Sequence, residues 1–258
     1  MDSLKNKSVI LTGAGSGIGR ITAKMLGAMG ANIFIVGRRE NLLIDTVKEI
    51  EEAGGKGAYI SADLEDGDAA ANVAEVAIKE FGNIQYLINN AGHSSKVRAL
   101  RYVEKEDWQS VFNVNVEGVY RLTQAIIPNM IENREGTIVT VSSMAAITPG
   151  LMGGIPYSSA KAAVAAMMTA MRQELREYGI RSCTIYPAEV DTPILDNRPL
   201  PPDAKARSTM MQPEDIAEAI LLCMRMPQRT IVQDLVVSPT IMRDVSEDMK
   251  IAKNLKSK

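Results

Sequence analysis

Two side chains that can move a proton lie close together in the segment PYSSAKAAV, residues 156–164. Tyr157 and Lys161 are four residues apart, so on a helix their side chains would share one face. A tyrosine, with a pKa of about 10, exchanges protons near neutral pH only when its anion is stabilised. A cation within about 4–6 Å lowers such a pKa by ~1–3 units. The pair therefore fits a proton donor tuned by a lysine, or a lysine that simply extends past a half-buried tyrosine.

A second stretch with chemical potential is the glycine-rich segment TGAGSGIGR, residues 12–20. It follows an apolar run typical of a strand and opens a helical pattern, with glycines at 13, 15, 17 and 19. Glycines permit a tight turn and a close approach of the backbone, and the start of a helix offers free N–H groups to a pyrophosphate. The spacing is T-G-x-x-x-G-x-G, and its place between strand and helix predicts dinucleotide binding.

The end of the second predicted strand reads VGRRE, residues 36–40. Gly37 stands where a ribose-binding acid is expected, and Arg38 and Arg39 follow it. A guanidinium can clamp a 2′-phosphate that a carboxylate would repel. The segment therefore favours NADP(H), with Arg38 preferred over Arg39 as the clamp. Glu40 could still reach a ribose, which keeps NAD(H) open, and a solvated arginine pair is the alternative without a ligand.

Length and composition limit what kind of protein this is. The chain has 258 residues, a formal charge of −2 and 46% apolar residues, which suits one large α/β domain. The near-neutral charge argues against nucleic acid or an acidic membrane as partner, and no apolar run is long enough to span a bilayer. Cys183, Cys223 and the single histidine, His93, match no metal spacing. We expect no metal site and a cytoplasmic location.

Apolar runs alternate with helical patterns along the chain, which predicts a parallel sheet with helices on both faces. Strands are predicted at 8–13, 32–37, 57–63, 84–92, 137–143, 181–187 and 231–239. Helices are predicted near 17–30, 39–54, 66–82, 102–131, 155–178 and 213–226. We therefore expect one domain over 1–258, with a Pro-rich covering loop at 191–213 and a polar, loosely held tail at about 240–258.

Three motifs in order make the chain resemble the short-chain dehydrogenase/reductase family over roughly residues 5 to 240. They are the glycine loop, the segment Asn89-Asn90-Ala91-Gly92, and Tyr157-x-x-x-Lys161. The resemblance implies a doubly wound, Rossmann-like, seven-stranded parallel sheet with strand order 3-2-1-4-5-6-7. It also implies a nicotinamide cofactor, with NADP(H) preferred and NAD(H) as the alternative.

The resemblance also assigns roles to individual residues. As catalytic residues it implies Asn115, Ser143, Tyr157 and Lys161. As cofactor-binding residues it implies Thr12, Gly13, Ser16, Gly17, Ile18, Gly19, Arg38, Arg39, Asp63, Leu64, Asn90, Ala91, Gly92, Tyr157, Lys161, Pro187, Val190 and Thr192. In these roles Lys161 also holds the nicotinamide ribose, and Ser143 donates a hydrogen bond to the substrate oxygen.

Two positions depart from the family pattern. Ser143 lies fourteen residues before Tyr157, one more than is usual, which leaves Ser142 as the alternative to the preferred Ser143. Ala188 replaces the usual glycine after the sixth strand. Asn115 gives a separate signal, because it lies on an apolar helical stripe where an amide is costly unless paired. It is therefore either a satisfied core amide or part of a proton relay beside Lys161.

These observations predict an NADP(H)-dependent carbonyl reductase or alcohol dehydrogenase acting on a ketone, aldehyde or secondary alcohol. An NAD-dependent dehydrogenase and a non-catalytic dinucleotide sensor are the alternatives. We expect non-catalytic roles for His93 and for Glu189, which we predict to be solvated. The helix at 155–178 is apolar nearly all round, and the resemblance implies that it and the helix at 102–131 form a homodimer or homotetramer interface.

Overall fold

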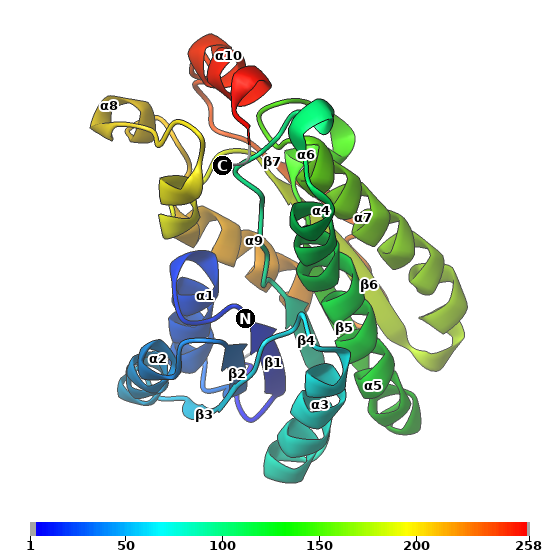
Figure 1. Cartoon of the computed structure of the whole chain (residues 1–258). Coiled ribbons are helices and arrows are strands. Elements are labelled where there is room, and N and C mark those ends of the chain that lie inside the picture. The colour runs from blue at the N-terminus through cyan, green and yellow to red at the C-terminus, as the bar shows by residue number, and fades with distance from the viewer. Residues whose placement is uncertain (1–3, 257–258) are drawn as a thin grey trace.

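Seven parallel strands form one sheet in the centre of the molecule (Figure 1). The computed structural model describes residues 4–256. The strand order is β3-β2-β1-β4-β5-β6-β7, which confirms the doubly wound topology. The strands are β1 (Ser8–Thr12), β2 (Asn32–Gly37), β3 (Lys56–Ser61), β4 (Tyr86–Asn89), β5 (Gly136–Val141), β6 (Ile180–Pro187) and β7 (Asp234–Val237). Because all seven are parallel, the segments that follow them meet at one edge, where ligands bind in such sheets.

Helices cover both faces of the sheet. On one face lie α1 (Gly17–Ala28), α2 (Glu40–Glu52) and α9 (Pro213–Arg225). On the other face lie α3 (Gly67–Phe81), α4 (Lys105–Phe112), α5 (Gly118–Asn133) and α7 (Ile155–Leu175). Successive residues of β1 alternate between the two cores, since Val9 and Leu11 face the first group and Ile10 faces the second. This two-sided burial explains the continuous apolar runs of the strands.

The helix predicted near 102–131 is interrupted in the structure. A short 3-10 helix, η1 (Leu100–Tyr102), precedes α4, and a π-helical segment, η2 (Asn113–Glu117), joins α4 to α5. A π-helical turn holds an extra residue, and such turns often occur at functional sites. The apolar stripe continues across it, so the sequence pattern alone could not reveal it.

Strand β4 is shorter than the predicted 84–92 because the chain leaves the sheet after Asn89. The N–H of Asn90 and that of Ala91 both donate to the side chain of Thr12, at 3.0 Å each, instead of to a neighbouring strand. The strand predicted at 231–239 is also shorter, since β7 covers only Asp234–Val237.

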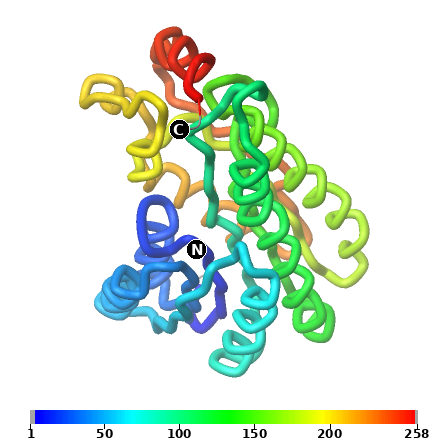
Figure 2. Tube along the Cα trace, in the orientation of Figure 1, coloured from blue at the N-terminus to red at the C-terminus, as the bar shows by residue number. Residues whose placement is uncertain are grey.

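The covering loop and the tail contain short helices at one end of the molecule (Figures 1 and 2). The 191–213 segment holds η4 (Pro193–Asn197) and α8 (Ala204–Arg207), and the tail holds α10 (Ser246–Asn254). Within the described part of the tail, α10 is held by the ion pairs described below, whereas we predicted a loosely held segment. Among the described helices, none combines the length and apolar character needed to cross a membrane.

Candidate active site

Tyr157 and Lys161 lie in the first two turns of α7, which begins directly after Gly154. Gly154 has a φ of +82°, and Pro156 suits the first turn of a helix because its missing N–H needs no partner there. The Lys161 side chain is buried, and its Nζ donates a 2.9 Å hydrogen bond to the carbonyl of Val141. Its Nζ also lies 5.6 Å from the centre of the Tyr157 ring. The predicted pair is thus brought together at the end of β5.

Burial has the largest effect on the pKa of both groups. It lowers the pKa of Lys161 to about 8 and raises the pKa of Tyr157 above its ordinary value. A hydrogen bond with Ser143 and the positive charges of Arg198 and Arg98 act in the opposite direction on Tyr157. Our expectation that Lys161 makes Tyr157 more acidic is therefore not met in the protein alone, because desolvation of the phenol outweighs the nearby charges.

The two serines after β5 point to different surroundings. Ser142 is buried and its hydroxyl donates a 2.9 Å hydrogen bond to the carbonyl of Lys161. Ser143 begins the short helix α6 (Met144–Ile147), where its Oγ accepts a 3.1 Å hydrogen bond from the N–H of Ala145. Ser143 also hydrogen-bonds Tyr157. Consecutive side chains at a strand end face opposite ways, so only the second serine reaches the tyrosine.

Asn115 lies in the π-helical segment η2 and is fully paired by backbone groups. Its Nδ2 donates to the carbonyls of His93 (2.7 Å) and Val111 (2.8 Å), and its Oδ1 accepts from the N–H of His93 at 3.4 Å. A Cβ on Gly92 would lie 3.3 Å from Asn115 Oδ1 and 3.4 Å from Lys161 Nζ. Asn115 therefore fixes the loop after β4 beside Lys161. Its amide has its hydrogen bonds satisfied, and it also lies next to Lys161, where we predicted the proton relay.

The glycine loop is tied to the end of β4 around one threonine and one asparagine. Asn90 Nδ2 donates to the carbonyls of Thr12 (3.0 Å) and Gly13 (3.3 Å). A Cβ on Gly13 would lie 2.9 Å from the Cα of Ala91, and one on Gly19 would lie 2.3 Å from the carbonyl oxygen of Gly13. Both distances are too short for a side chain, so these glycines are required by the close approach of the two segments.

The start of α1 has the features of an anion site. Ser16 occupies the N-cap position without a side-chain hydrogen bond to the helix, and the first turn carries no acidic residue. Gly17 has a φ of +54°, and a Cβ there would lie 3.2 Å from the side chain of Thr192. A glycine turn with helix N–H groups fits the pyrophosphate of a dinucleotide. The cradle thus suits the predicted cofactor, and Ile18 lies in its first helical turn.

The arginine pair splits between two partners. Arg39 Nη2 donates to Ser16 Oγ at 3.1 Å, whereas Arg38 Nη1 lies 3.7 Å from Asp63 Oδ2. Arg38 is 63% exposed and so remains available to a ligand. Glu40, the alternative ribose ligand, accepts a 3.2 Å hydrogen bond from the hydroxyl of Tyr59. Each arginine therefore lies beside the glycine loop or Asp63, and Leu64, which follows Asp63 in the chain, is buried.

The segment after β6 closes the site opposite the glycine loop. Val190 bridges to Met211, and Thr192 is buried with its methyl group against Gly17. Pro187 ends the strand, and the N–H of Ala188 donates to the carbonyl of Val237 at 2.9 Å. The alanine that replaces the usual glycine is thus held by ordinary strand pairing.

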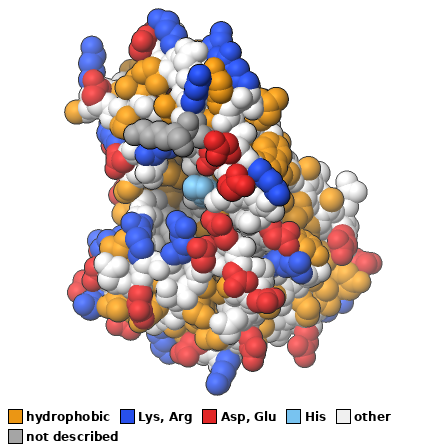
Figure 3. Space-filling model, in the orientation of Figure 1, with side chains coloured by type: hydrophobic (Ala, Val, Ile, Leu, Met, Phe, Trp, Pro, Cys, Tyr) orange, Lys and Arg blue, Asp and Glu red, His pale blue; other side chains and the backbone are white. Residues whose placement is uncertain are grey.

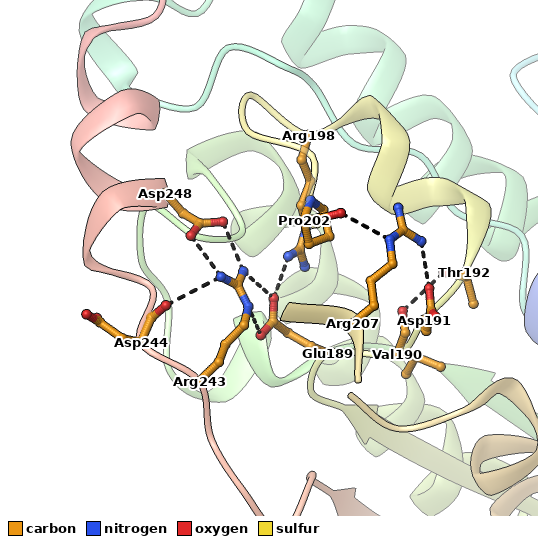
Figure 4. Close-up of polar contacts among 10 residues, drawn as sticks. All are labelled: Glu189, Val190, Asp191, Thr192, Arg198, Pro202, Arg207, Arg243, Asp244 and Asp248. Carbon is orange, nitrogen blue, oxygen red and sulfur yellow. Dashed lines mark hydrogen bonds and ion pairs between the residues drawn. The ribbon is translucent and has the colours of Figure 1, made fainter. Parts of the chain in front are cut away.

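The predictions missed a group of charged side chains above this edge (Figure 4). Glu189 was expected to be solvated, but its side chain is only 17% exposed and pairs with Arg198 and with Arg243. Arg243 also binds Asp248 of α10 through two 2.9 Å hydrogen bonds. Burial opposes ionisation of Glu189, yet hydrogen bonds from Arg243 and Arg198 hold its pKa below its ordinary value. Glu189 lies 9 positions from Arg198 and 54 from Arg243, so no local pattern reveals these pairs.

A space-filling view shows this side of the molecule hollowed below the end that carries α8 and α10 (Figure 3). Basic and acidic side chains surround the hollow on this face. Within residues 4–256, no group of three or more His, Cys, Asp and Glu side chains is arranged to hold a metal ion.

Comparisons with known proteins agree with this geometry. The family model described as short chain dehydrogenase matches residues 7–201. A 3-oxoacyl-(acyl-carrier-protein) reductase of Thermotoga maritima is 34% identical over 227 residues, covering 84% of this chain and 90% of that protein. Two solved structures are also similar. A metagenomic short-chain oxidoreductase in complex with NADP has 28% identity and a TM-score of 0.80, covering 93% of this chain and all of that one.

The second solved structure is a 3-ketoacyl-(acyl-carrier-protein) reductase from Brucella melitensis, complexed with NADH. It has 31% identity and a TM-score of 0.82, and covers 91% of this chain and 98% of that one. Both neighbours hold a nicotinamide dinucleotide, which is the kind of cofactor that the family resemblance implies for this chain, whereas the preference between NADP(H) and NAD(H) stays a prediction. Family match, fold and nucleotide cradle together make this chain a short-chain dehydrogenase, an oxidoreductase of the short-chain dehydrogenase/reductase family.

Proposed function

We propose that this protein is an NADP(H)-dependent carbonyl reductase or alcohol dehydrogenase that acts on a ketone, an aldehyde or a secondary alcohol. The observation that carries the proposal is the meeting of Tyr157, Ser143 and Lys161 at the edge of the sheet that also holds the glycine cradle. A proton donor and a dinucleotide site at one edge are what carbonyl reduction requires.

In this mechanism the bound nicotinamide supplies the hydride, and the protein supplies the proton and the hydrogen bonds. Tyr157 donates the proton to the substrate oxygen as negative charge develops there. Burial raises its pKa, so the phenol carries the proton that this step needs near neutral pH, while Ser143 and the charges of Arg198 and Arg98 favour the anion left behind. Ser143, which already hydrogen-bonds Tyr157, would donate to the same oxygen and stabilise the developing charge.

Lys161 and Asn115 would orient the site and restore the proton. Lys161 Nζ bonds the Val141 carbonyl and has two further N–H donors, which fits the ribose hydroxyls of a nucleotide. Its pKa of about 8 lets it exchange protons near neutral pH. Asn115 would act by holding the loop after β4 against Lys161. Thr12, Asn90 and the glycines would hold the cofactor backbone.

The preference for NADP(H) rests on the arginine pair. Arg39 with Ser16, and Arg38 beside Asp63, offer donors on both sides of the position expected for a 2′-phosphate. The sequence favoured Arg38 as the residue that binds the 2′-phosphate. The hydrogen bond from Arg39 to Ser16 supports binding of the phosphate by both arginines.

The experiment that tests this proposal is fluorescence titration of the purified protein with NADPH and NADH. We expect NADPH to bind at least tenfold more tightly, a difference of about 1.4 kcal/mol. Arg38→Ala and Arg39→Ala should each reduce the ratio of NADPH affinity to NADH affinity without weakening NADH binding. Equal affinities in the unaltered protein would favour the NAD-dependent alternative, with Glu40 as the ribose ligand. A panel of ketones and aldehydes with the preferred cofactor would then detect turnover by loss of reduced nucleotide.

A non-catalytic dinucleotide sensor is the remaining candidate, and Tyr157→Phe distinguishes it. The substitution removes the proton donor and keeps the ring, so we expect NADPH binding to remain and turnover to fall by about 10²–10⁴-fold. Tyr178→Phe is the matched control and should leave both unchanged. Turnover equal to the unaltered protein in Tyr157→Phe would contradict the proposed mechanism. We further propose a cytoplasmic homodimer or homotetramer, formed through helices within 102–131 and 155–178.

A further inference from the structure

Arg98 is a buried arginine for which the described part of the chain provides no ionic partner. It lies between β4 and η1, and its side chain packs on Gly154, where a Cβ would lie 2.8 Å from Arg98 Cβ. Only 5% of the residue is exposed, and its Nε is buried without a hydrogen-bond partner. Within residues 4–256 its guanidinium makes no ion pair. A buried cation without a partner is costly, so its presence calls for a reason.

The surroundings of Arg98 place it at the reacting end of the site. Its charge interacts with the Tyr157 hydroxyl, and it lines a cavity of about 10 Å³ together with Met152, Arg198, Leu200 and Asp248. That volume holds about one water molecule. The cavity thus lies between Arg98 and the segments that cover this edge of the sheet, namely the residues after η4 and α10.

The other charged groups around this cavity are already matched. Arg198 and Arg243 face Glu189 and Asp248, which gives two positive and two negative charges (Figure 4). Arg98 adds a third positive charge. Asp248, which lines the same cavity, attracts it, but the ion pair of that carboxylate is with Arg243. Burial lowers its pKa to about 10, so the guanidinium still carries its charge at neutral pH. The cluster therefore has one positive charge too many for a closed, dry site.

We propose that the missing counterpart is the carboxylate of the substrate, so that the enzyme acts on a short oxo acid and the corresponding hydroxy acid. This inference rests on the proposed carbonyl chemistry at Tyr157. A planar guanidinium can donate two parallel hydrogen bonds to a carboxylate, which would fix the substrate and turn its carbonyl towards Tyr157. The apolar side chains of Met152 and Leu200 would contact a short carbon chain.

Because Arg98 is buried and makes no ion pair within residues 4–256, a substrate with one negative charge should bind better than a neutral one. A neutral ester or ketone would leave the guanidinium desolvated and unpaired, and such a mismatch gives strong discrimination. To admit a substrate larger than water, the residues at 198–200 and α10 must move outwards. The ion pairs of Glu189 link both segments to the end of β6 and would restore the closed arrangement.

The test compares each acid with its methyl ester, using pyruvate, 2-oxobutanoate and 3-oxobutanoate with the preferred cofactor. We expect kcat/KM to be about a hundredfold higher for at least one acid than for its ester. Arg98→Met, which keeps an unbranched apolar side chain, should lower kcat/KM about a hundredfold for that acid and by a much smaller factor for the ester, where only the effect of the Arg98 charge on Tyr157 is lost. Arg98→Lys should recover part of the activity on the acid, because it restores the charge without the fork.

A binding measurement separates this inference from the proposed function. Butanoate and butanamide, neither of which can be reduced, are titrated calorimetrically into the protein saturated with the cofactor. We expect butanoate to bind and butanamide not to, and Arg98→Met to abolish the difference. If esters and simple ketones are reduced as well as acids, the carboxylate proposal fails while the oxidoreductase function stands. If NADPH binds but no carbonyl is reduced, the proposed function fails, and butanoate binding still decides the role of Arg98.

Discussion

At the scale of single residues, burial decides the properties of the candidate catalytic groups. Lys161 and Tyr157 both lie out of water at the end of β5, so the charged form of each is disfavoured. The pair therefore rests as a neutral phenol beside a lysine that titrates near pH 8, rather than as a phenolate held by an ammonium. Of the two serines after β5, Ser143 hydrogen-bonds Tyr157, whereas the hydroxyl of Ser142 donates to the Lys161 carbonyl in α7.

The lowered pKa of Lys161 predicts how stability depends on pH. Between pH 8 and pH 10 the unfolded chain holds a proton on this lysine that the folded chain has released, so folding becomes more favourable as pH rises. Below pH 8 the folded chain carries the buried charge on Lys161, and the full cost of that charge to stability is present. We expect the free energy of unfolding, measured with urea without cofactor, to rise by roughly 1–3 kcal/mol over this window relative to Lys161→Met. A difference between the two proteins that stays constant with pH would contradict the assignment.

Substitution of Ser143 should mainly lower kcat, and substitution of Ser142 should mainly lower the free energy of unfolding. Ser143→Ala removes a hydrogen bond to the reacting oxygen, so we expect kcat to fall by about 10²–10³-fold with about 1 kcal/mol lost from the helix cap. Ser142→Ala removes a buried hydrogen bond to the Lys161 carbonyl and should cost about 1 kcal/mol in unfolding free energy with a small effect on kcat. Steady-state kinetics and urea unfolding of both variants check this. The reverse pattern would identify Ser142 as the catalytic serine.

At the scale of elements, the site depends on how closely the segments after the strands approach each other. The glycine loop after β1 touches the loop after β4, and Thr192 after β6 touches Gly17. The π-helical segment η2 brings Asn115 against the loop that carries Gly92. The tail helix α10 is fixed above the same edge by Arg243. Apart from the Arg243–Asp248 pair, each contact joins residues more than 20 positions apart in sequence.

The close approach at Gly19 predicts a sharp effect of one methyl group. A Cβ at this position would lie 2.3 Å from the carbonyl oxygen of Gly13, which is rigid backbone. We expect Gly19→Ala to weaken NADPH binding by at least about tenfold, because the cradle must open to accept the methyl group. Gly15→Ala is the matched control in the same loop, since its Cβ would meet only side chains, Leu42 at 3.3 Å and Leu43 at 4.0 Å. Equal nucleotide affinities for the two variants would rule out the steric argument.

The ion pairs of Arg243 predict the order of the tail. Arg243→Met leaves Glu189 with one partner and Asp248 with none, and both carboxylates are largely buried. We expect faster hydrogen exchange in 244–254 and a loss of about 2–4 kcal/mol in unfolding free energy. Lys250→Met removes only the exposed pair with Glu247 and should change stability by less than about 0.5 kcal/mol. Unchanged exchange in Arg243→Met would mean that other contacts hold α10.

At the scale of the whole molecule, the parallel sheet places every chemical feature at one edge. The ends of β1, β2, β4, β5 and β6 carry, in turn, the glycine loop, the arginine pair, the segment at 90–93, the serines and the covering segment. The helices at the outer surface carry large exposed side chains, including Trp108 on α4 and Tyr120 on α5. These residues lie in the region that we propose as the subunit interface.

The proposed assembly can be tested with one exposed aromatic residue. Tyr120 is 38% exposed on α5, and Tyr120→Lys would place a charge within the proposed interface. We expect sedimentation to give a dimer or tetramer for the unaltered protein and a smaller species for this variant. Leu222→Lys on α9, a residue exposed to 42%, lies on the other face of the sheet and should keep the assembly. A monomer in the unaltered protein would contradict the proposal.

The sequence alone determined the α/β class with a parallel sheet and predicted a dinucleotide loop, because apolar runs mark strands buried on both faces and the glycine spacing marks a turn that only glycine can form. The strand order, the nicotinamide cofactor and the family followed from the resemblance that three motifs in order carry. The same patterns located Tyr157, Lys161 and Asn115, whose roles remain proposals. Tyr157 and Lys161 are four residues apart, and Asn115 lies on a local apolar stripe. These patterns can therefore be recognised without the tertiary structure.

Only the tertiary structure decided which charges and hydroxyls face each other. The π-helical turn at Asn115, the orientation of Ser142 away from Tyr157 and the pairing of Glu189 with Arg243 all depend on contacts between distant segments. The unpaired Nε of Arg98 within residues 4–256 is of the same kind, since a missing hydrogen-bond partner is a property of the folded surroundings. Desolvation likewise depends on what packs around a group, so the pKa values of Tyr157 and Lys161 could not be read from their spacing.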